Sequence, residues 1–419
     1  MKESKFLSRE RIFEFLVAAF AFSIPFKAIY NSLLVVVLAL YAIFALDKRL
    51  DRNTVLGVLG VSIVFWIAVL WLVQSKNFEE GLFRVQQKSI ITIIPAIFAL
   101  CSYNHSRVRS VFLSFFLFGV VAAMAVSLIH GFFFWWSSGS FEKLTGHGLV
   151  EYLDVYTYIL ALLCLLAQVI IMESFLKGNK LLFVPNRLRM GLLLFLVMSL
   201  FILAVQQVII CWIALCLAYI FRSVKRRRWV IFSMLALLLA LAAGVSFVRP
   251  LREKVHDSVF GSPRNTIPLD DSAPWKEEWN GVAIRKAIWT CSWDVVKDNP
   301  LFGVGTGNEQ DELQKVYLNR KFYLAAHYNK FNAHNQYIQI IVGTGVIGFV
   351  LIFGASAWSF WRLRSSRLFL YALTAVLIAM LTESMLETNK GCLIFSIVVS
   401  LPFIGGRGEV KLGGGHHAV

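Results

Sequence analysis

Residues 334–358 read HNQYIQIIVGTGVIGFVLIFGASAW and contain no Asp, Glu, Lys or Arg. A helix needs about 20 mainly apolar residues to cross the hydrocarbon core of a bilayer, so this stretch predicts a membrane-spanning helix. Similar runs recur, and we expect about twelve spans, although the nearly continuous pairs 12–46 and 190–221 also allow ten or eleven. The predicted ranges are 12–25, 28–46, 55–73, 88–102, 110–130, 150–172, 190–205, 208–221, 229–248, 334–358, 368–385 and 391–405.

The composition of the 419 residues also indicates a membrane protein. Hydrophobic residues make up 58% of the chain, charged residues make up 16%, and the mean hydropathy is +0.68. A soluble domain has about 45–50% apolar residues and could not cover so much apolar surface. These values exclude an ordinary cytosolic enzyme and a disordered protein. A disulfide scaffold is also excluded, because five of the six cysteines lie within apolar runs. The sequence therefore predicts an all-α polytopic membrane protein.

The distribution of charge predicts the direction of the spans. The net charge is +16, which in a soluble protein would suggest a nucleic-acid partner. With the N-terminus in the cytoplasm, most Lys and Arg fall in inner loops, including FRSVKRRRW at 221–229, as the positive-inside rule requires. We therefore expect both termini in the cytoplasm and no nucleic-acid partner. The cations of the short outer loops are Lys27, Lys76, Arg84, Lys88, Lys143 and Lys390.

The predicted spans divide the chain into four parts. Residues 1–248 would form an N-terminal bundle of about nine helices, 334–405 would add about three, and 406–419 would form a cytoplasmic tail. Residues 249–333 would form a large, partly helical loop domain on the periplasmic side. Within it, the range 276–300 has apolar residues at helical spacing and ends in a proline.

A glycine-rich turn, LFGVGTGNEQ at 301–310, follows this predicted helix. It is not a phosphate-binding P-loop, since no Lys-Ser/Thr pair follows the glycines, and no strand–helix unit surrounds it as in a dinucleotide site. Two interpretations remain for Gly303, Gly305 and Gly307. They could allow positive φ angles in a tight turn, or their N–H groups could form a nest that faces an anion.

His334 and Gly345 lie eleven residues apart, which on a helix of 100° per residue places them within about 20° of one direction. Gly348 lies about 40° from His334. A stripe of this kind would hold His334 at the outer membrane boundary, with small residues deeper that let a neighbouring helix approach closely. The alternative is that His334 is a capping or interfacial residue.

The motifs of this region resemble those of a known family. The pair His-Asn at 334–335, nine further residues and Gly-x-x-Gly at 345–348 resemble the signature of the bacterial O-antigen ligase and O-antigen polymerase superfamily. Upstream, Arg-x-x-x-Trp at 285–289 and NPLFGVG at 299–305 resemble the other end of the same family block. The local resemblance covers about residues 280–350, and the remainder agrees in the order of its predicted spans.

This resemblance implies a GT-C-like membrane glycosyltransferase of the bacterial inner membrane with its active site on the periplasmic side. The donor would be a polysaccharide on undecaprenyl pyrophosphate, and the acceptor would be lipid A–core or another glycan. The family is metal-independent, so we expect no metal and no cofactor. The first interpretation is an O-antigen ligase. An O-antigen or exopolysaccharide polymerase, a protein O-oligosaccharyltransferase and, from another class, a transporter of lipid-linked glycans are the alternatives.

The chemistry of the side chains suggests roles for a few residues. An unperturbed histidine has a pKa of about 6.5, so His334 could accept the proton of the acceptor hydroxyl at neutral pH. Arg285 could bind the diphosphate through paired N–H donors, or it could form an exposed ion pair with Glu277, Glu278 or Asp294. The substrate-binding candidates are Asn335, Arg84, Lys88, Arg264 and Gln207, and the helix-packing candidates are Gly345 and Gly348.

One position departs from the ligase pattern. Ligases usually have a second arginine near the outer turn between spans seven and eight, where this chain reads LAVQQVIICW at 203–212. Arg84, Lys88 or Arg264 would have to replace that arginine, unless the chain handles its donor differently or is inactive. The carboxylates to which this interpretation gives no catalytic role are Glu14, Asp154, Glu383 and Glu387.

Overall fold

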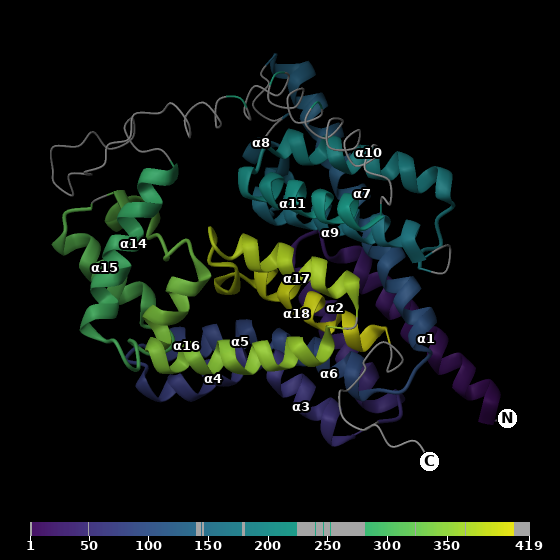
Figure 1. Ribbon diagram of the computed structural model, residues 1–419, viewed down its shortest axis with the longest axis horizontal. Coiled ribbons are helices and arrows are strands. Elements are labelled where there is room, and N and C mark those ends of the chain that lie inside the picture. Colours follow the sequence, from purple (N-terminus) through teal and green to yellow (C-terminus); the bar gives the residue numbers. More distant parts are fainter. Residues whose placement is uncertain are drawn as a thin grey trace.

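The computed structural model describes residues 2–48, 50–139, 144, 146–177, 181–223, 281–322, 324–364 and 366–405, with the single residues 239, 246 and 252. Within these ranges the chain is helical, as predicted, and extended backbone pairs only in an isolated bridge between Lys48 and Cys101. Figure 1 shows how the helices are arranged.

The described helices are α1 (Lys2–Ser23), α2 (Ala28–Ala45), α3 (Arg52–Val61), α4 (Ile63–Trp71), α5 (Phe78–Lys88), α6 (Ile90–Leu100), α7 (His105–Ser138), α8 (Gly146–Val150), α9 (Thr157–Lys177), α10 (Asn186–Leu203), α11 (Gln206–Ser223), α14 (Gly281–Asp298), α15 (Glu309–Asn319), α16 (Gln336–Leu363), α17 (Arg367–Ala379) and α18 (Asn389–Ile404). Short 3-10 turns are η1 (Leu72–Gln74), η3 (Glu151–Leu153) and η5 (Met385–Glu387), and η4 (Leu324–Asn329) is a π turn.

Five of these helices, α2, α7, α9, α10 and α16, are long and apolar enough to cross a membrane. Helices α3 and α4 reach that length only together, and they are bent by 63°. Helices α11, α17 and α18 are apolar but shorter. The described residues therefore form a polytopic membrane protein with five or six spans of full length, so the count of twelve is not confirmed. Of the predicted span 229–248, the structure describes only residues 239 and 246.

Helix α18 forms the centre of the fold. Every residue from Lys390 to Ile404 is buried, and α6 and α17 pack directly against this helix. In Figure 1, α18 lies between α9 above and α16 below. The segment that connects α17 to α18 therefore emerges from the middle of the bundle, and it carries the carboxylates Glu383 and Glu387.

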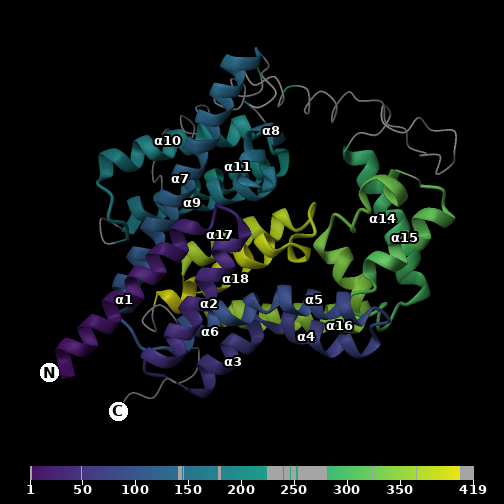
Figure 2. The same ribbon diagram turned by 180° about the vertical axis from the view of Figure 1, so that it is seen from behind.

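Helices α14 and α15 form a lobe at one end of the molecule, opposite the start of α1 (Figures 1 and 2). Helix α14 agrees with the helix predicted before Pro300. The lobe has its own small core, which includes Ile288, Cys291, Leu313 and Tyr317. This core explains how a segment with many charges can still fold outside the apolar bundle.

The turn after α14 fills a break in α16. The backbone of α16 is not helical at Gly345, where φ is 64° and ψ is −171°. A break inside an apolar helix leaves backbone N–H and C=O groups without partners, which is costly away from water. The turn 300–305 supplies those partners. Its hydrogen bonds with α16 run from Val304 N to Val342 O (3.0 Å), Gly305 N to Gly343 O (2.9 Å), Val346 N to Pro300 O (2.9 Å) and Ile347 N to Leu301 O (3.1 Å).

Glycine makes this close backbone contact possible. A Cβ on Gly345 would lie 2.3 Å from the carbonyl oxygen of Leu301, and one on Gly303 would lie 2.5 Å from the nitrogen of Gly345. The φ angles of Gly303, Gly305 and Gly307 are 67°, 91° and 93°, which confirms the interpretation as a positive-φ turn. The interpretation as a nest for an external anion is wrong. The N–H of Gly305 donates to α16, and that of Gly307 donates to the carboxylate of Glu309.

The predicted stripe from His334 to Gly348 is also wrong. His334 precedes α16 and has a φ of 43°, and the break at Gly345 interrupts the angular relation that the stripe assumed. A Cβ on Gly348 would meet the side chain of Thr344 in the same helix at 2.3 Å. The small residues of this motif therefore do not make room for a neighbouring helix. Gly345 leaves space for the turn 300–305, and Gly348 leaves space for the side chain of Thr344.

We expect Gly345→Ala to destabilise the fold by about 2–5 kcal/mol, because alanine disfavours this φ and its Cβ would overlap the turn. Thermal unfolding in detergent measures the change. The matched control is Gly354→Ala in the same helix, where an added Cβ has no heavy atom within 4 Å and alanine favours the helix. Equal melting temperatures for the two variants would contradict the structural role of the break.

Candidate active site

The pair His334-Asn335 is fixed by the segment that follows α17. The Asn335 side chain caps α16 by accepting hydrogen bonds from Tyr337 N (2.9 Å) and Ile338 N (3.1 Å). The same side chain donates to the carbonyl of Leu381 (2.9 Å), and the backbone N–H of Asn335 donates to Ser384 Oγ (3.2 Å). Asn335 is therefore a capping residue, and its contacts hold His334 at the start of α16.

Glu383 joins the two residues predicted to be catalytic. Its Oε2 lies 3.3 Å from His334 Nδ1, and its Oε1 lies 3.0 Å from Arg285 Nη2. The side chains of His334 and Arg285 are each 28% exposed, and that of Glu383 is 15% exposed. Arg285 also donates from Nε to the carbonyl of Thr382 (3.3 Å). The ring of Phe331 contacts His334 edge to face at 5.4 Å.

This geometry corrects the alternative partner of Arg285. Asp294 pairs with Arg320, and Glu277 and Glu278 lie outside the described residues. The partner of Arg285 is Glu383, about 100 positions further along the chain. An imidazole, a carboxylate and a guanidinium therefore form one partly exposed group, which we call the His–Glu–Arg cluster (His334, Glu383 and Arg285).

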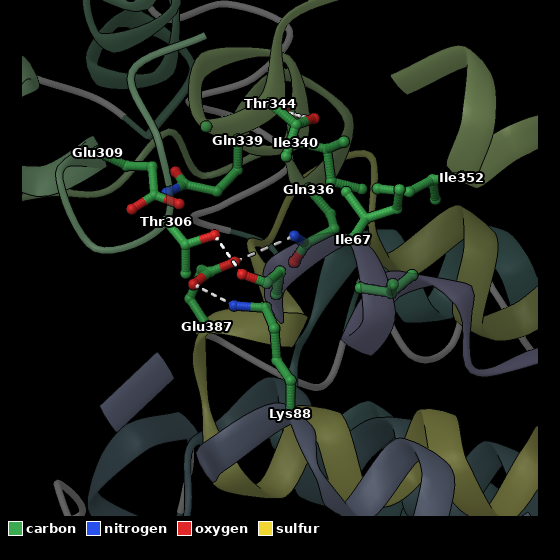
Figure 3. Close-up of a pocket in the computed structure, with 13 residues that line it drawn as sticks. Ile67, Lys88, Thr306, Glu309, Gln336, Gln339, Ile340, Thr344, Ile352 and Glu387 are labelled. Carbon is green, nitrogen blue, oxygen red and sulfur yellow. Dashed lines mark hydrogen bonds and ion pairs between the residues drawn. The ribbon is translucent and has the colours of Figure 1, made fainter. Parts of the chain in front are cut away.

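A second carboxylate, Glu387, contacts Lys88 and Arg84, the two cations of α5 that were predicted to bind substrate. Lys88 Nζ lies 3.0 Å from Glu387 Oε2, and Arg84 Nη1 donates to the backbone carbonyl of Glu387 (3.2 Å). Gln336 Nε2 donates to Glu387 Oε1 at 3.3 Å (Figure 3). The Lys88 side chain is only 8% exposed, so it does not extend toward lipid headgroups. Arg84 is 22% exposed and also pairs with Glu80.

A small pocket with both polar and apolar lining lies beside Glu387 and has room for about two water molecules. Lys88, Glu387, Gln336 and Glu309 line it (Figure 3). Burial raises the pKa of Glu309 to about 7; the charge of Glu387 adds to this shift and that of Lys88 opposes it. Burial also disfavours the charge of Glu387, but Lys88 and Arg84 outweigh it and hold the pKa of Glu387 below its usual value.

The described residues contain no group of three or more His, Cys, Asp or Glu side chains placed to hold a metal ion. The acidic residues near the candidate site are instead paired with Arg285, Lys88 and Arg84.

Two predicted residues are not joined to these groups. Gln207 lies in the first turn of α11, whose helical contacts are with α9, α10 and α17. Arg264 lies outside the described residues. The structure places His334, Asn335 and Arg285 around the segment that follows α17, and their roles stay predictions.

The sequence interpretation gave Glu383 and Glu387 no catalytic role, and it did not single out Glu309. A usable signal was present, since Glu383 and Glu387 stand between two apolar runs on the side where few charges are expected. An ionised group at the edge of a bilayer is costly unless it is paired, which marks such positions as candidates for function. Glu309 had no comparable signal, because it lies in a segment with many charges.

We expect Glu309→Gln to remove a pH dependence of stability. The raised pKa means that the folded protein binds more protons than the unfolded chain between pH 4.5 and about 7, so wild-type stability falls as pH rises through this window. Relative to wild type, the variant should gain roughly 1–3 kcal/mol between pH 5 and pH 8. Thermal unfolding at both pH values measures this gain.

The matched control is Glu312→Gln on the same helix, α15. Lys315 keeps the pKa of Glu312 below its usual value, so this carboxylate is ionised throughout the tested range and its removal should shift stability equally at pH 5 and pH 8. A wild-type pH dependence that persists in Glu309→Gln would contradict the assignment.

Comparison with known proteins shows which family part of the chain resembles. A model of the O-antigen ligase family matches residues 191–353, a range that contains Arg285, the turn 300–305 and His334. Glu383, Glu387 and the cations of α5 lie outside this range, although they complete the site in space. A search of curated proteins found no match to the chain. Residues 191–353 are thus similar to the O-antigen ligase family.

Proposed function

We propose that this protein transfers a glycan from undecaprenyl pyrophosphate to the hydroxyl of an acceptor sugar, with lipid A–core as the first expected acceptor. The observation that supports this best is the position of Glu383, which lies 3.3 Å from His334 and 3.0 Å from Arg285. Transfer from a diphosphate requires a base for the attacking hydroxyl and a cation for the leaving group. The carboxylate of Glu383 holds the proposed base, His334, and the proposed cation, Arg285, beside each other.

His334 acts as the general base. A carboxylate beside Nδ1 favours the tautomer with its proton on Nδ1, which leaves the lone pair on Nε2 as acceptor. The acceptor hydroxyl gives its proton to Nε2 while its oxygen forms a bond to the anomeric carbon of the donor. The bond from that carbon to the phosphate oxygen breaks, and its electron pair leaves with undecaprenyl pyrophosphate. The proposal includes no metal and no cofactor.

Arg285 binds the leaving diphosphate. Its guanidinium offers paired N–H donors that match phosphate oxygens, and part of it is open to solvent. Arg84 is the second cation of the proposal, because it is more exposed than Lys88. Lys88 neutralises Glu387 and so fixes the segment that carries Glu383. These α5 cations, or Arg264, take the place of the arginine that is missing near Gln207.

The location follows from the same arrangement. Arg285 of the His–Glu–Arg cluster belongs to α14 of the lobe, and the start of α1 lies at the end of the molecule opposite the lobe (Figure 1). With the N-terminus inside, as the charge distribution predicts, the cluster faces the periplasm of a bacterial inner membrane. The small core of the lobe supports the division that places 249–333 outside the membrane, between the bundle 1–248 and the helices of 334–405.

Reconstitution in vesicles tests this function. The vesicles contain undecaprenyl-pyrophosphate glycan with lipid A–core, or the donor alone. Glycan attached to the core identifies a ligase, and longer chains from donor alone identify a polymerase, which the same cluster could serve. Glycan found inside sealed vesicles without a new bond would identify a transporter and contradict the proposal.

His334→Ala should abolish glycan transfer, because the acceptor hydroxyl loses its base. Product formation in the reconstituted system measures this, and unchanged melting behaviour shows that the fold is intact. The control is His327→Ala, an exposed histidine of the same segment, which should transfer at the wild-type rate. Near wild-type transfer by His334→Ala would remove the general-base role.

Arg285→Lys should lower kcat/KM by about tenfold or more, since a point charge replaces a two-pronged contact with the diphosphate. The matched control is Arg320→Lys in the lobe, where the arginine pairs with Asp294, and it should leave kcat/KM unchanged. An equal kcat/KM for Arg285→Lys and wild type would count against diphosphate binding by Arg285.

A further inference from the structure

A turn rich in tyrosine precedes α9 on the surface of the protein. Tyr152, Asp154 and Tyr156 precede α9 and Tyr158 lies in its first turn, and we call these four residues the tyrosine turn. Tyr152 and Tyr156 are each 58% exposed, and the carboxylate of Asp154 is exposed between them. Asp154 has a φ of 54°, a left-handed conformation that aspartate tolerates better than most residues. The backbone therefore presents two rings and one carboxylate on a short exposed segment.

The rings of the tyrosine turn are held in place by stacking. Tyr152 stacks on His130 of α7 with ring centroids 4.6 Å apart and planes 22° from parallel. Tyr156 stacks on Tyr158 at 5.9 Å and 24°. A ring that is stacked on one face and more than half exposed has its orientation fixed while much of its surface stays available. Aromatic rings fixed in this way can bind a ligand at little conformational cost.

The tyrosine turn approaches the segment between α17 and α18 through Tyr158. Tyr158 lies beside the side chain of Thr388 and within electrostatic range of Glu383. Figures 1 and 2 show the beginning of α9 and the segment between α17 and α18 on the side of the molecule that faces the lobe. Through Tyr158, the tyrosine turn therefore lies next to the segment that carries Glu383.

We propose that the tyrosine turn binds sugar rings of the glycan substrate, a proposal that rests on the proposed function. A pyranose ring presents a flat face of C–H groups that packs on an aromatic ring, and its hydroxyls donate hydrogen bonds to a carboxylate such as Asp154. Tyr152 and Tyr156 are four residues apart, so their Cα atoms are separated by at most about 14 Å. This length suits a few consecutive sugar units beyond the one that reacts.

An aromatic belt at the membrane interface is the competing explanation, since Tyr is enriched there. A tyrosine of an interfacial belt needs only to be amphipathic. Its loss would lower the stability of the protein in the membrane, and the effect on activity would be the same for every substrate. A sugar-binding ring affects only substrates long enough to reach it. Glycan length therefore distinguishes the two explanations.

The test uses the full chain in lipid nanodiscs, with donors that carry one sugar or several repeat units, and acceptors of graded length. For the double variant Tyr152→Leu/Tyr156→Leu we expect KM for the long glycan to rise about tenfold, with kcat and KM for the one-sugar donor unchanged. The conservative Tyr152→Phe/Tyr156→Phe should keep most of the wild-type affinity. A rise limited to the long donor or to the long acceptor tells which glycan occupies the turn.

The matched control is Tyr30→Leu at the start of α2, a tyrosine that is 54% exposed and lies away from the tyrosine turn in sequence. It should change neither kinetic constant. Wild-type KM for long glycans in the double variant would overturn the proposal and leave the belt as the explanation. Lower stability with no dependence on glycan length would overturn it as well.

A binding measurement separates this proposal from the proposed function. Free oligosaccharide of the long glycan is titrated onto the His334→Ala protein, which needs no transfer, and binding is followed by ligand-observed NMR. Loss of binding in the added Tyr152→Leu/Tyr156→Leu variant supports the sugar site even if wild-type protein transfers nothing. Equal binding with and without the tyrosines contradicts it, whatever the outcome of the transfer assay.

Discussion

The site depends on a contact between two backbones. Helix α16 is broken at Gly345, and the turn 300–305 satisfies the polar groups that the break releases. Because these are hydrogen bonds within an apolar helix, the alternative to pairing is an unsatisfied donor or acceptor away from water. These bonds attach the lobe, which carries Arg285 at the start of α14, to α16, the helix that begins just after His334.

The second constraint is the pairing of charge along one segment. Between α17 and α18 the chain places Glu383 against His334 and Arg285, and Glu387 against Lys88 and Arg84. Ionised groups at a membrane boundary persist when each has a partner. The same pairing brings a base and several cations to one place, so the demands of stability and of the proposed chemistry coincide in this segment.

The helical class and the position of His334, Asn335 and Arg285 could be predicted from sequence, because apolar run length and a local motif carry that information. The breaks in the helices could not be predicted from the sequence. The break at Gly345 depends on a distant partner, the turn 300–305, and a periodicity argument assumes that a helix continues. The ion-pair partner of Arg285 could not be predicted either, since Asp294 is nearer in the chain while Glu383 is nearer in space.

The burial of α18 has a consequence for biosynthesis. A ribosome makes the chain from its N-terminus, so the helices that surround α18 emerge and insert before the helix around which they pack. Until α18 arrives, the bundle has an unfilled centre, and the segment with Glu383 and Glu387 has no fixed position. Insertion of the last described helix therefore assembles the scaffold and the charged cluster in the same event, and a chain interrupted before residue 389 would possess neither.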